Sequence, residues 1–272
     1  MAPERQSDQP GLTGEPDTSG PSAARMYDYY LGGSANFAVD RAAADEQLRV
    51  LPSVATTARA NRAFLSRAVR FCLDQGVNQF LDLGSGVPTV GNVHEIAHRL
   101  DPAARIAYVD REPIAVAHSR RLLGDERRVT VTQADLTDPR AVLDAPGVAG
   151  LLDFARPVAV LAISVLHFVR DDQVPGRVLA TYRDACVPGS ILALSHTTIE
   201  NLAPDTVDLG LAIYQRTSTP VFPRPITEAS ALLDGYEILD PGAVPVTRWR
   251  PDTEADAAAP VANTWAAVGI RR

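Results

Sequence analysis

The feature that most constrains this chain is the segment 79–86, QFLDLGSG, in which a short apolar run ends in an acid and a glycine pair follows. This order is typical of a buried parallel strand that turns tightly into a helix. The glycines allow the backbone to approach a ligand closely, and the following helix offers free N–H groups. Asp82 is therefore expected at the carboxyl end of a strand, where open α/β sheets bind ligands.

A carboxylate at this position discriminates between nucleotide ligands. Asp82 can accept hydrogen bonds from a ligand amine or a bound water, whereas it would repel a pyrophosphate. The dinucleotide fingerprint G-x-G-x-x-G requires a third glycine, but Thr89 stands at that position. The segment favours a nucleoside ligand without phosphates, such as S-adenosylmethionine, over a nicotinamide dinucleotide. A glycine turn that binds no ligand is the simplest alternative.

Strand-like and helix-like patterns alternate through the middle of the chain. Such alternation predicts a doubly wound parallel sheet. Two further strand-like segments, YEILD and TWAAVGI, lie between residues 236 and 270 with no clear helix between them, so we expect an antiparallel hairpin there. The predicted fold is α/β: a Rossmann-like, doubly wound, seven-stranded and mostly parallel sheet. The strand patterns before the hairpin are 80–83, 105–110, 129–133, 157–163 and 190–194, and the helical patterns between them are 92–100, 113–123 and 173–186.

The region before the first strand divides into two parts. Residues 1–22 are rich in Pro, Gly, Ser and acids, which predicts a disordered tail. Helical patterns follow at 23–30, 34–51 and 54–75, and they predict an N-terminal helical cover. We expect one domain over 23–272, made of a cover (23–75) and a Rossmann-like core (76–272). The segment 27–41 is interpreted either as a mobile lid or as a static cover.

Charge and cysteine usage restrict the partners and the compartment. The net charge is −7, so a general attraction to nucleic acid is not expected. No apolar run reaches the length of a membrane span, and the N-terminus has no apolar core of a secretory signal. Cys72 and Cys186 lie far apart in apolar stretches, which indicates buried, reduced thiols rather than metal ligands. These observations predict a cytoplasmic protein without a metal.

Acidic residues recur at the ends of the next predicted strands. Asp110 ends the second strand 24 residues after Gly86, close to the spacing at which an acid reaches a ribose diol. Asp135 follows the third strand, where a carboxylate can accept a hydrogen bond from an adenine amine while Leu136 packs on the ring. Three acids on three successive strand ends predict a polar pocket with apolar walls.

The order DLGSG, YVD, ADL and a loop after strand four resembles class I S-adenosylmethionine-dependent methyltransferases. Longer segments resemble an actinobacterial S-adenosyl methyltransferase family that was formerly a domain of unknown function. The resemblance covers the chain from Pro21 onward and implies the fold and the cofactor, S-adenosylmethionine, but no substrate. The segments that carry it are PSAARMYDYYLGGSANFAVDR, NRAFLSRAV, GVPTVGNVHEIA, SVLHFV, LSH and VPVTRWRPD.

Residues can be assigned to the site from this resemblance. The cofactor loop corresponds to Asp82, Gly84, Ser85 and Gly86, the ribose acid to Asp110, and the adenine site to Asp135 with Leu136. Arg111 departs from the pattern, because many methyltransferases have a small or apolar residue after the ribose acid. It is expected either over the adenine face or in solvent.

Several further residues are expected in the site. Arg62 is preferred over Arg59 as the partner of the cofactor carboxylate, since arginine binds carboxylates bidentately. Tyr27 and Ser164 are also expected in the cofactor pocket. His167 and His196 follow strands four and five and are candidates for a general base, because imidazole can accept a proton near pH 7.

The predicted function is S-adenosylmethionine-dependent methyl transfer to a small-molecule acceptor. Two alternatives remain open. A non-catalytic adenosyl-ligand-binding protein would keep the pocket without the chemistry. A nicotinamide-dependent oxidoreductase is disfavoured by the missing third glycine and by Asp82. Neither the oligomeric state nor the acceptor atom follows from the sequence.

Overall fold

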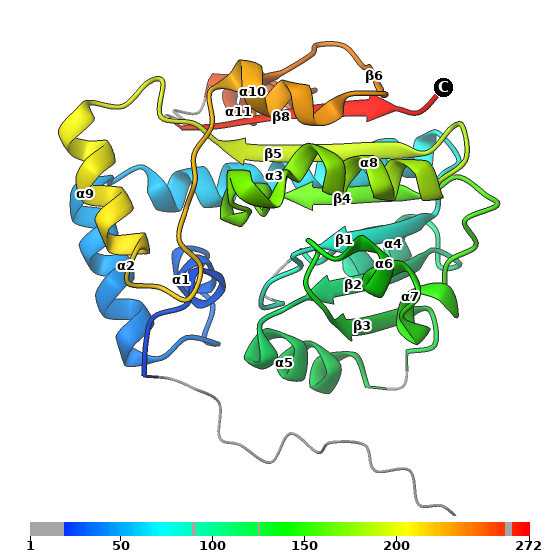
Figure 1. Cartoon of the computed structure of the whole chain (residues 1–272), viewed down its shortest axis with the longest axis horizontal. Helices are drawn as coiled ribbons and strands as arrows, with labels where there is room; N and C mark the ends of the chain where they lie inside the picture. The colour runs from blue at the N-terminus through cyan, green and yellow to red at the C-terminus, as the bar shows by residue number, and fades with distance from the viewer. Residues whose placement is uncertain (1–18, 89–90, 125, 259–262) are drawn as a thin grey trace, which may run out of the picture.

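The computed structural model describes residues 19–88, 91–124, 126–258 and 263–272, and its centre is an eight-stranded sheet (Figure 1). The strand order is β3-β2-β1-β4-β5-β8-β6, with β7 also paired to β8. The first five strands are mutually parallel, β8 runs antiparallel to β5, and β6 and β7 each pair antiparallel with β8. The strands are β1 (Gln79–Leu83), β2 (Arg105–Asp110), β3 (Val129–Gln133), β4 (Ala159–Ile163), β5 (Ile191–Thr197), β6 (Glu237–Ile238), β7 (Val244–Pro245) and β8 (Thr264–Ile270).

The predicted mostly parallel, doubly wound sheet is confirmed. The C-terminal strands form a more complex arrangement than the expected hairpin, because β8 lies between β5 and β6. The short strands β6 and β7 pair with opposite ends of β8, so the eight strands fill seven positions across the sheet. The connection between β6 and β8 also contains the helix α11 (Glu254–Ala258), so these two strands do not form a simple hairpin.

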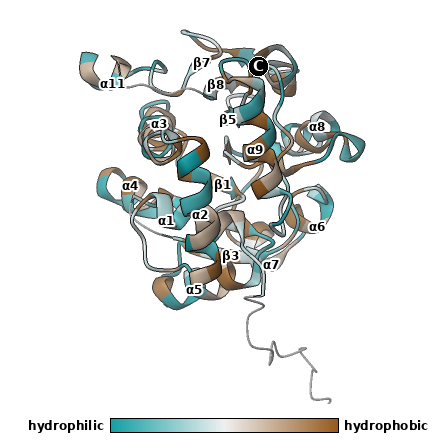
Figure 2. Ribbon diagram, turned by 90° about the vertical axis from the view of Figure 1, so that its left-hand side faces the viewer, coloured by the Kyte–Doolittle hydropathy of each residue, from teal (hydrophilic) through white to brown (hydrophobic). Residues whose placement is uncertain are grey.

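Helices cover both faces of the sheet (Figure 2). Along β1 the side chains alternate, so that Phe80 joins one apolar core while Leu81 and Leu83 join the other. The first core includes α3 (Val54–Asp74) and α4 (Val93–Leu100), with α5 (Pro113–Leu123) at its border. The second includes α6 (Pro139–Leu143), α7 (Pro146–Ala149), α8 (Pro175–Ala185) and α10 (Ile226–Ser230), with the short helical turn Ala231–Leu233. This double covering explains why the parallel strands are almost continuously apolar.

A separate helical cover lies beyond the carboxyl ends of the parallel strands (Figure 1). It consists of α1 (Ala23–Tyr30), α2 (Ala38–Val50), the first half of α3 and α9 (Pro204–Tyr214). Met26, Ala44, Ala58 and Ile213 form its small apolar core. The sequence predicted the three N-terminal helices of this cover but not α9, which enters from the loop after β5.

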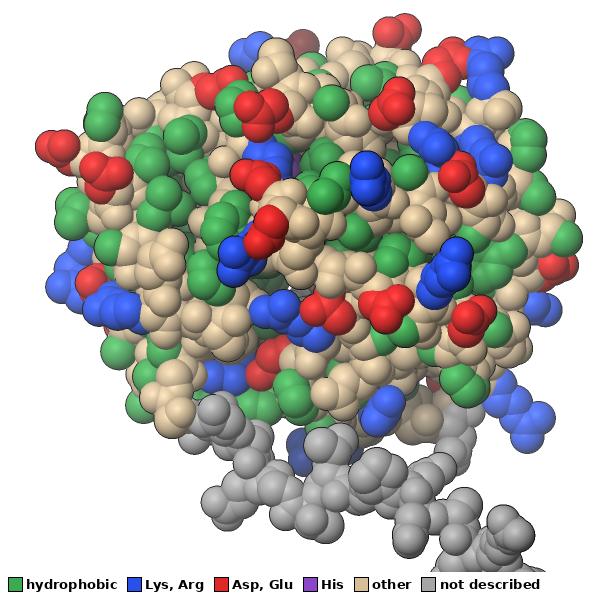
Figure 3. Space-filling view, viewed as in Figure 1, with side chains coloured by type: hydrophobic (Ala, Val, Ile, Leu, Met, Phe, Trp, Pro, Cys, Tyr) green, Lys and Arg blue, Asp and Glu red, His purple; other side chains and the backbone are tan. Residues whose placement is uncertain are grey.

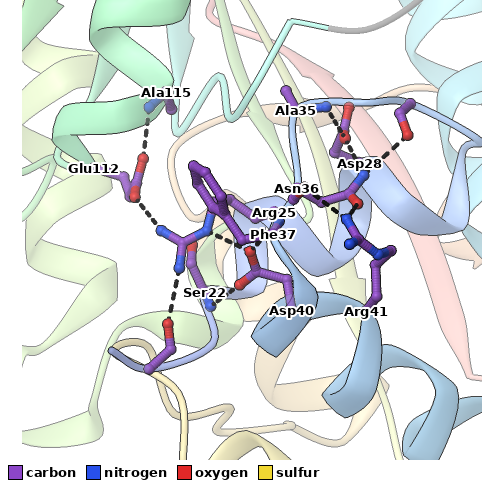
Figure 4. A network of polar contacts seen from close by, with 12 residues as sticks. Ser22, Arg25, Asp28, Ala35, Asn36, Phe37, Asp40, Arg41, Glu112 and Ala115 are labelled. Carbon is purple, nitrogen blue, oxygen red and sulfur yellow. Dashed lines mark hydrogen bonds and ion pairs between the residues drawn. The ribbon is translucent and has the colours of Figure 1, made fainter. Parts of the chain in front are cut away.

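The cover is attached to the sheet domain by the buried side chain of Arg25 (Figure 4). Its Nε donates to Asp40 Oδ2 at 2.7 Å, and its Nη1 donates to Glu112 Oε1 at 2.8 Å. Glu112 caps α5, since its Oε2 accepts a hydrogen bond from the backbone N–H of Ala115. One guanidinium therefore joins α1, α2 and the loop after β2.

The structure describes the chain from residue 19, a few residues before the first helix of the cover. Residues 1–18 of the predicted disordered tail lie outside the described residues. Ser22, which was placed at the end of that tail, is buried, and its backbone N–H donates to Asp40 Oδ1 at 2.9 Å. None of the helices in the described ranges combines the length and the apolar character that a membrane crossing requires.

Candidate functional site

A cavity of about 810 Å³ lies between the carboxyl ends of the parallel strands and the helical cover. Residues from the ends of β1, β2, β3, β4 and β5 line it on one side. Residues of α1, α2, α3 and α9 line it on the other. Its volume is in the range of cavities that bind cofactors and small ligands, and it contains every predicted site residue except His196.

The glycine turn after β1 has the geometry of a ligand cradle. Gly84 and Gly86 have φ of +71° and +67°, a region that favours glycine. A Cβ on Gly84 would lie 2.1 Å from Val165 Cγ2, whereas a Cβ on Gly86 would meet no described atom within 4 Å. The turn is held to β2, because the N–H groups of Gly84 and Ser85 both donate to the carbonyl of Val109. The backbone at Gly86 is thus left open toward a ligand.

Asp82 is buried at the cavity wall with an exposed fraction of 7%. No described residue donates a hydrogen bond to its carboxylate. Burial raises its pKa to about 7; the charge of Arg62 lowers this pKa, and Asp110 raises it further. A buried carboxylate without a hydrogen-bond donor is unfavourable in a free protein, and a ligand amine or water would satisfy it.

Asp110 faces the same cavity and also organises the loops around it. Its Oδ2 accepts the N–H of Gly86 at 2.7 Å, and its Oδ1 accepts the N–H of Glu112 at 2.8 Å. Burial raises the pKa of this carboxyl, and the hydrogen bonds from Glu112 and Gly86 oppose that effect. The second strand's acid therefore holds the glycine turn of the first strand in place.

The third acid lies at the more exposed edge of the cavity. Asp135 Oδ1 accepts hydrogen bonds from the N–H and the hydroxyl of Thr137, and Leu136 beside it is buried. Arg111 Nη1 lies 3.6 Å from Asp135 Oδ2, and its Nη2 donates to the carbonyl of Ser218. Arg111 thus crosses the rim from β2 toward the segment after α9, while its side chain stays 47% exposed.

Arg62 lies on α3 at the wall of the cavity, near Asp82. Its Nη2 donates to the carbonyl of Gly91 at 2.7 Å, which ties α3 to the loop before α4. Arg59, the alternative considered from the sequence, is exposed and donates to Thr56. The structure places only Arg62 of this pair in the cavity lining.

A chain of hydrogen bonds connects Tyr27 with Ser164 along the cavity wall. The Tyr27 hydroxyl donates to the carbonyl of Ala58 and accepts from Asn61 Nδ2 at 3.0 Å. Asn61 Oδ1 accepts from Ser195 Oγ at 2.7 Å, and Ser195 Oγ accepts from the N–H of Ser164 at 2.9 Å. Sequence reasoning missed Asn61 and Ser195, although each precedes a residue that it singled out.

His167 lines the cavity as a neutral, donating imidazole. Its Nδ1 accepts the N–H of Thr197 at 3.4 Å, so the ring proton belongs on Nε2. Burial and the neighbouring His196 and Arg224 hold the pKa of His167 well below its ordinary value. This arrangement makes the ring a hydrogen-bond donor at neutral pH, and it does not support the proton-accepting role expected from the sequence.

His196 is fully buried behind the cavity wall, stacked on Trp265. Its Nδ1 donates to the carbonyl of Thr197 at 2.7 Å, and its Nε2 accepts from Arg224 Nη1 at 3.2 Å. Both ring nitrogens have hydrogen-bond partners, and burial lowers the pKa of His196 to about 4. These contacts favour a packing role over the general-base role expected from the sequence.

Arg224, the hydrogen-bond partner of His196, is a buried structural residue that the sequence reasoning missed. All five of its side-chain N–H groups are used: they reach Asp171, the carbonyls of Leu166 and Val169, and His196. This buried guanidinium fixes the loop after β4, which carries His167. Its sequence context, FPRPI, offers only the prolines as a signal of an ordered segment.

The described residues contain no group of three His, Cys, Asp or Glu side chains that could hold a metal ion. The donors and acceptors around the glycine turn instead fit a nucleoside with an amino-acid tail. Three carboxylates and Arg62 line the cavity there, and the space beside Gly86 is open.

Two solved structures are similar to this chain over nearly its full length. A candidate methyltransferase from Thermobifida fusca has a TM-score of 0.88 and 37% identity, and the match covers 94% of this chain and 97% of that one. A DUF574 family protein from Streptomyces avermitilis has a TM-score of 0.88 and 35% identity, covering 94% and 99%. An O-methyltransferase family protein from Burkholderia thailandensis, with a TM-score of 0.53 and 15% identity, shares the fold over 94% of this chain and 65% of its own.

Sequence comparisons point in the same direction. A 66-residue stretch is 42% identical to the ribosomal RNA small subunit methyltransferase H of Halorhodospira halophila, and it spans 23% of this chain and about a fifth of that relative. The family model described as S-adenosyl methyltransferase matches residues 12–272. The chain therefore belongs to the S-adenosyl methyltransferase family and is an S-adenosylmethionine-dependent methyltransferase.

Proposed function

We propose that this methyltransferase holds its cofactor at the sheet side of the cavity and a small-molecule methyl acceptor between the cofactor and helices α2, α3 and α9. The observation that carries the proposal is the convergence of Asp82, Asp110 and Asp135, from three successive strand ends, on one cavity. A cavity of about 810 Å³ between the sheet and the cover suits a small acceptor better than a macromolecular one.

Each part of the cofactor has a candidate partner. We assign the amino-acid end to Asp82 and Arg62, the ribose to Asp110, and the adenine to Asp135 and Leu136. Arg111 closes the adenine edge. The main chain at Gly84, Ser85 and Gly86 passes beneath the cofactor, and Tyr27 and Ser164 lie along the wall beside it.

When bound, the cofactor supplies a methyl group on a sulfonium, which passes to an acceptor lone pair as the C–S bond breaks and the acceptor loses a proton. The residues of this chain contribute alignment and exclusion of water rather than a strong base. His167 donates a hydrogen bond from Nε2, which orients an acceptor oxygen. The proton of the acceptor leaves to solvent.

The distribution of charge on the molecular surface also supports a small-molecule acceptor over a nucleic acid. Acidic and basic side chains are interspersed on the face shown in Figure 3, without a continuous basic stripe that would follow a nucleic acid. We propose a cytoplasmic enzyme of actinobacterial type, with residues 23–272 as one methyltransferase domain. The non-catalytic alternative would bind the cofactor equally well, so only measured turnover distinguishes it.

Replacing Asp110 tests the assignment of the cofactor. The variant Asp110→Ala loses charge-assisted hydrogen bonds to the ribose, each worth roughly 1.5–3 kcal/mol. We expect its affinity for S-adenosylhomocysteine, measured by calorimetry, to fall at least about tenfold. The variant Asp74→Asn, which changes an exposed carboxylate on α3, is the matched control and should bind normally. Unchanged affinity in a folded Asp110→Ala protein would place the ribose elsewhere.

A further inference from the structure

We propose that the methyl acceptor of this enzyme is an uncharged, largely apolar small molecule. The inference rests on the proposed function and concerns the part of the cavity that the helical cover and the segment after β5 line, which we call the acceptor chamber. Its wall is formed by α2, the start of α3, the segment after β5 and α9. The chamber residues used below are Gln47, Leu51, Val54, Thr57, Ile199 and Leu211.

The charged side chains that line the cavity lie outside this chamber. Most belong to the ends of β1 and β2 and to the loops after β2 and β3, where the cofactor is placed. Arg62 stands at the border with the cofactor loop. Arg25 is paired with Asp40 and Glu112, and the half-exposed Arg216 is paired with Glu46. Within the described residues, α2, α3 before residue 62, the segment 197–202 and α9 contribute no charged side chain to the lining.

The chamber wall is instead apolar with a few neutral polar groups. Leu51, Val54, Ile199 and Leu211 supply its apolar surface. The side-chain oxygens Gln47 Oε1 and Thr57 Oγ1 are buried and have no hydrogen-bond partner among the described residues.

A charged acceptor would enter this chamber without a counter-charge. Removing an ionised group from water is strongly unfavourable unless it is paired and hydrogen-bonded. A neutral molecule with an apolar body avoids this penalty.

The reaction on such an acceptor is balanced without a further reagent. The acceptor exchanges an O–H or N–H bond for an O–CH₃ or N–CH₃ bond, the sulfonium becomes a neutral thioether, and one proton is released.

Three probes of matched shape test the inference: 4-ethylphenol is neutral, 4-hydroxybenzoate is anionic and tyramine is cationic. Their binding is measured by saturation-transfer NMR on protein that has first been saturated with S-adenosylhomocysteine. We expect 4-ethylphenol to bind at least about tenfold more tightly than either charged probe. Leu211→Trp should fill the chamber and abolish this binding. Leu209→Trp, on the same helix but 58% exposed and outside the lining, is the matched control and should retain it.

The outcomes separate the two proposals. If S-adenosylhomocysteine does not bind, the proposed function fails before the probes are used. If it binds, three results would overturn the present inference alone: a charged probe that binds as tightly as 4-ethylphenol, no binding of 4-ethylphenol, or binding that persists in Leu211→Trp. Retained S-adenosylhomocysteine binding by Leu211→Trp shows that this variant is folded.

Discussion

At the scale of single residues, Asp82 is the group whose chemistry depends most on a ligand. Burial raises its pKa to about 7 in the free protein, far above the ordinary value for aspartate. The folded state therefore binds a proton more tightly than the unfolded state does. The stability that this group contributes is fully present below about pH 4 and is lost as the pH rises through about 7.

A cationic ligand reverses this preference, which predicts a pH-dependent affinity. If the cofactor amine pairs with ionised Asp82, binding at pH 6 requires a form that makes up only about a tenth of the protein. We expect S-adenosylhomocysteine to bind about tenfold more weakly at pH 6 than at pH 8 in calorimetric titrations. Asp82→Asn should bind with a flat pH profile; an equally steep profile in this variant would assign the titration to another group.

The contacts of His196 favour a structural role, which differs from the role expected from the sequence. Because Nε2 of His196 accepts from the buried Arg224, His196→Ala leaves a guanidinium N–H without a partner. We expect the free energy of unfolding to fall by about 1–3 kcal/mol in urea titrations, with normal affinity for S-adenosylhomocysteine in the folded protein. Full stability combined with a loss of methyl transfer would restore the catalytic role.

At the scale of elements, the buried contacts of the helical cover favour a static cover over a mobile lid. Its link to the core, Arg25, is 2% exposed and pairs with Asp40 and Glu112 on two different elements. The Glu112 backbone in turn donates to Asp110. Movement of α1 would therefore break buried ion pairs close to the ribose site.

This arrangement predicts slow amide hydrogen exchange in α1 and α2 without a ligand, and little further protection when S-adenosylhomocysteine binds. Arg25→Leu leaves two carboxylates unpaired and should destabilise the protein by about 3–5 kcal/mol while increasing exchange in both helices. Strong protection of the segment 27–41 that appears only with ligand would contradict the static cover.

The sequence predicted the repeated strand–helix units well, because buried parallel strands leave long apolar runs with turn residues between them. The three N-terminal helices and the first five strands are found close to their predicted bounds. Helix α9 was missed, although PDTVDLGLAIY has proline at its start and apolar residues at helical spacing. Its place in the cover depends on contacts with α1, α2 and α3, which no local pattern encodes.

The candidate site, like the fold, could be predicted from the sequence only in part. Asp82, Asp110 and Asp135 follow from strand ends and spacing, and the structure brings them to one cavity. The partners Asn61, Ser195 and Arg224 could not be predicted in this way, because their contacts join segments that lie far apart in the sequence. The roles of the histidines depend on which atoms face each nitrogen, and this is fixed only by the tertiary structure.

At the scale of the whole molecule, a mostly parallel sheet supplies the acids and the glycine turn, and a helical cover closes the space above them (Figure 1). The two parts meet at the cavity of about 810 Å³. Under the proposed assignment, cofactor selectivity is a property of the assembled fold. We expect the carboxylates at the sheet side of the cavity to disfavour phosphates and to favour an adenosyl group with an amine.

Calorimetric titration of the purified protein with S-adenosylmethionine, S-adenosylhomocysteine, NAD and ATP tests this account most directly. The three strand-end carboxylates predict binding of both adenosyl ligands, with NAD and ATP weaker by at least about tenfold, a difference of 1.4 kcal/mol or more. NAD binding as tight as that of S-adenosylmethionine would contradict the assignment of this cavity as a methyl-donor site.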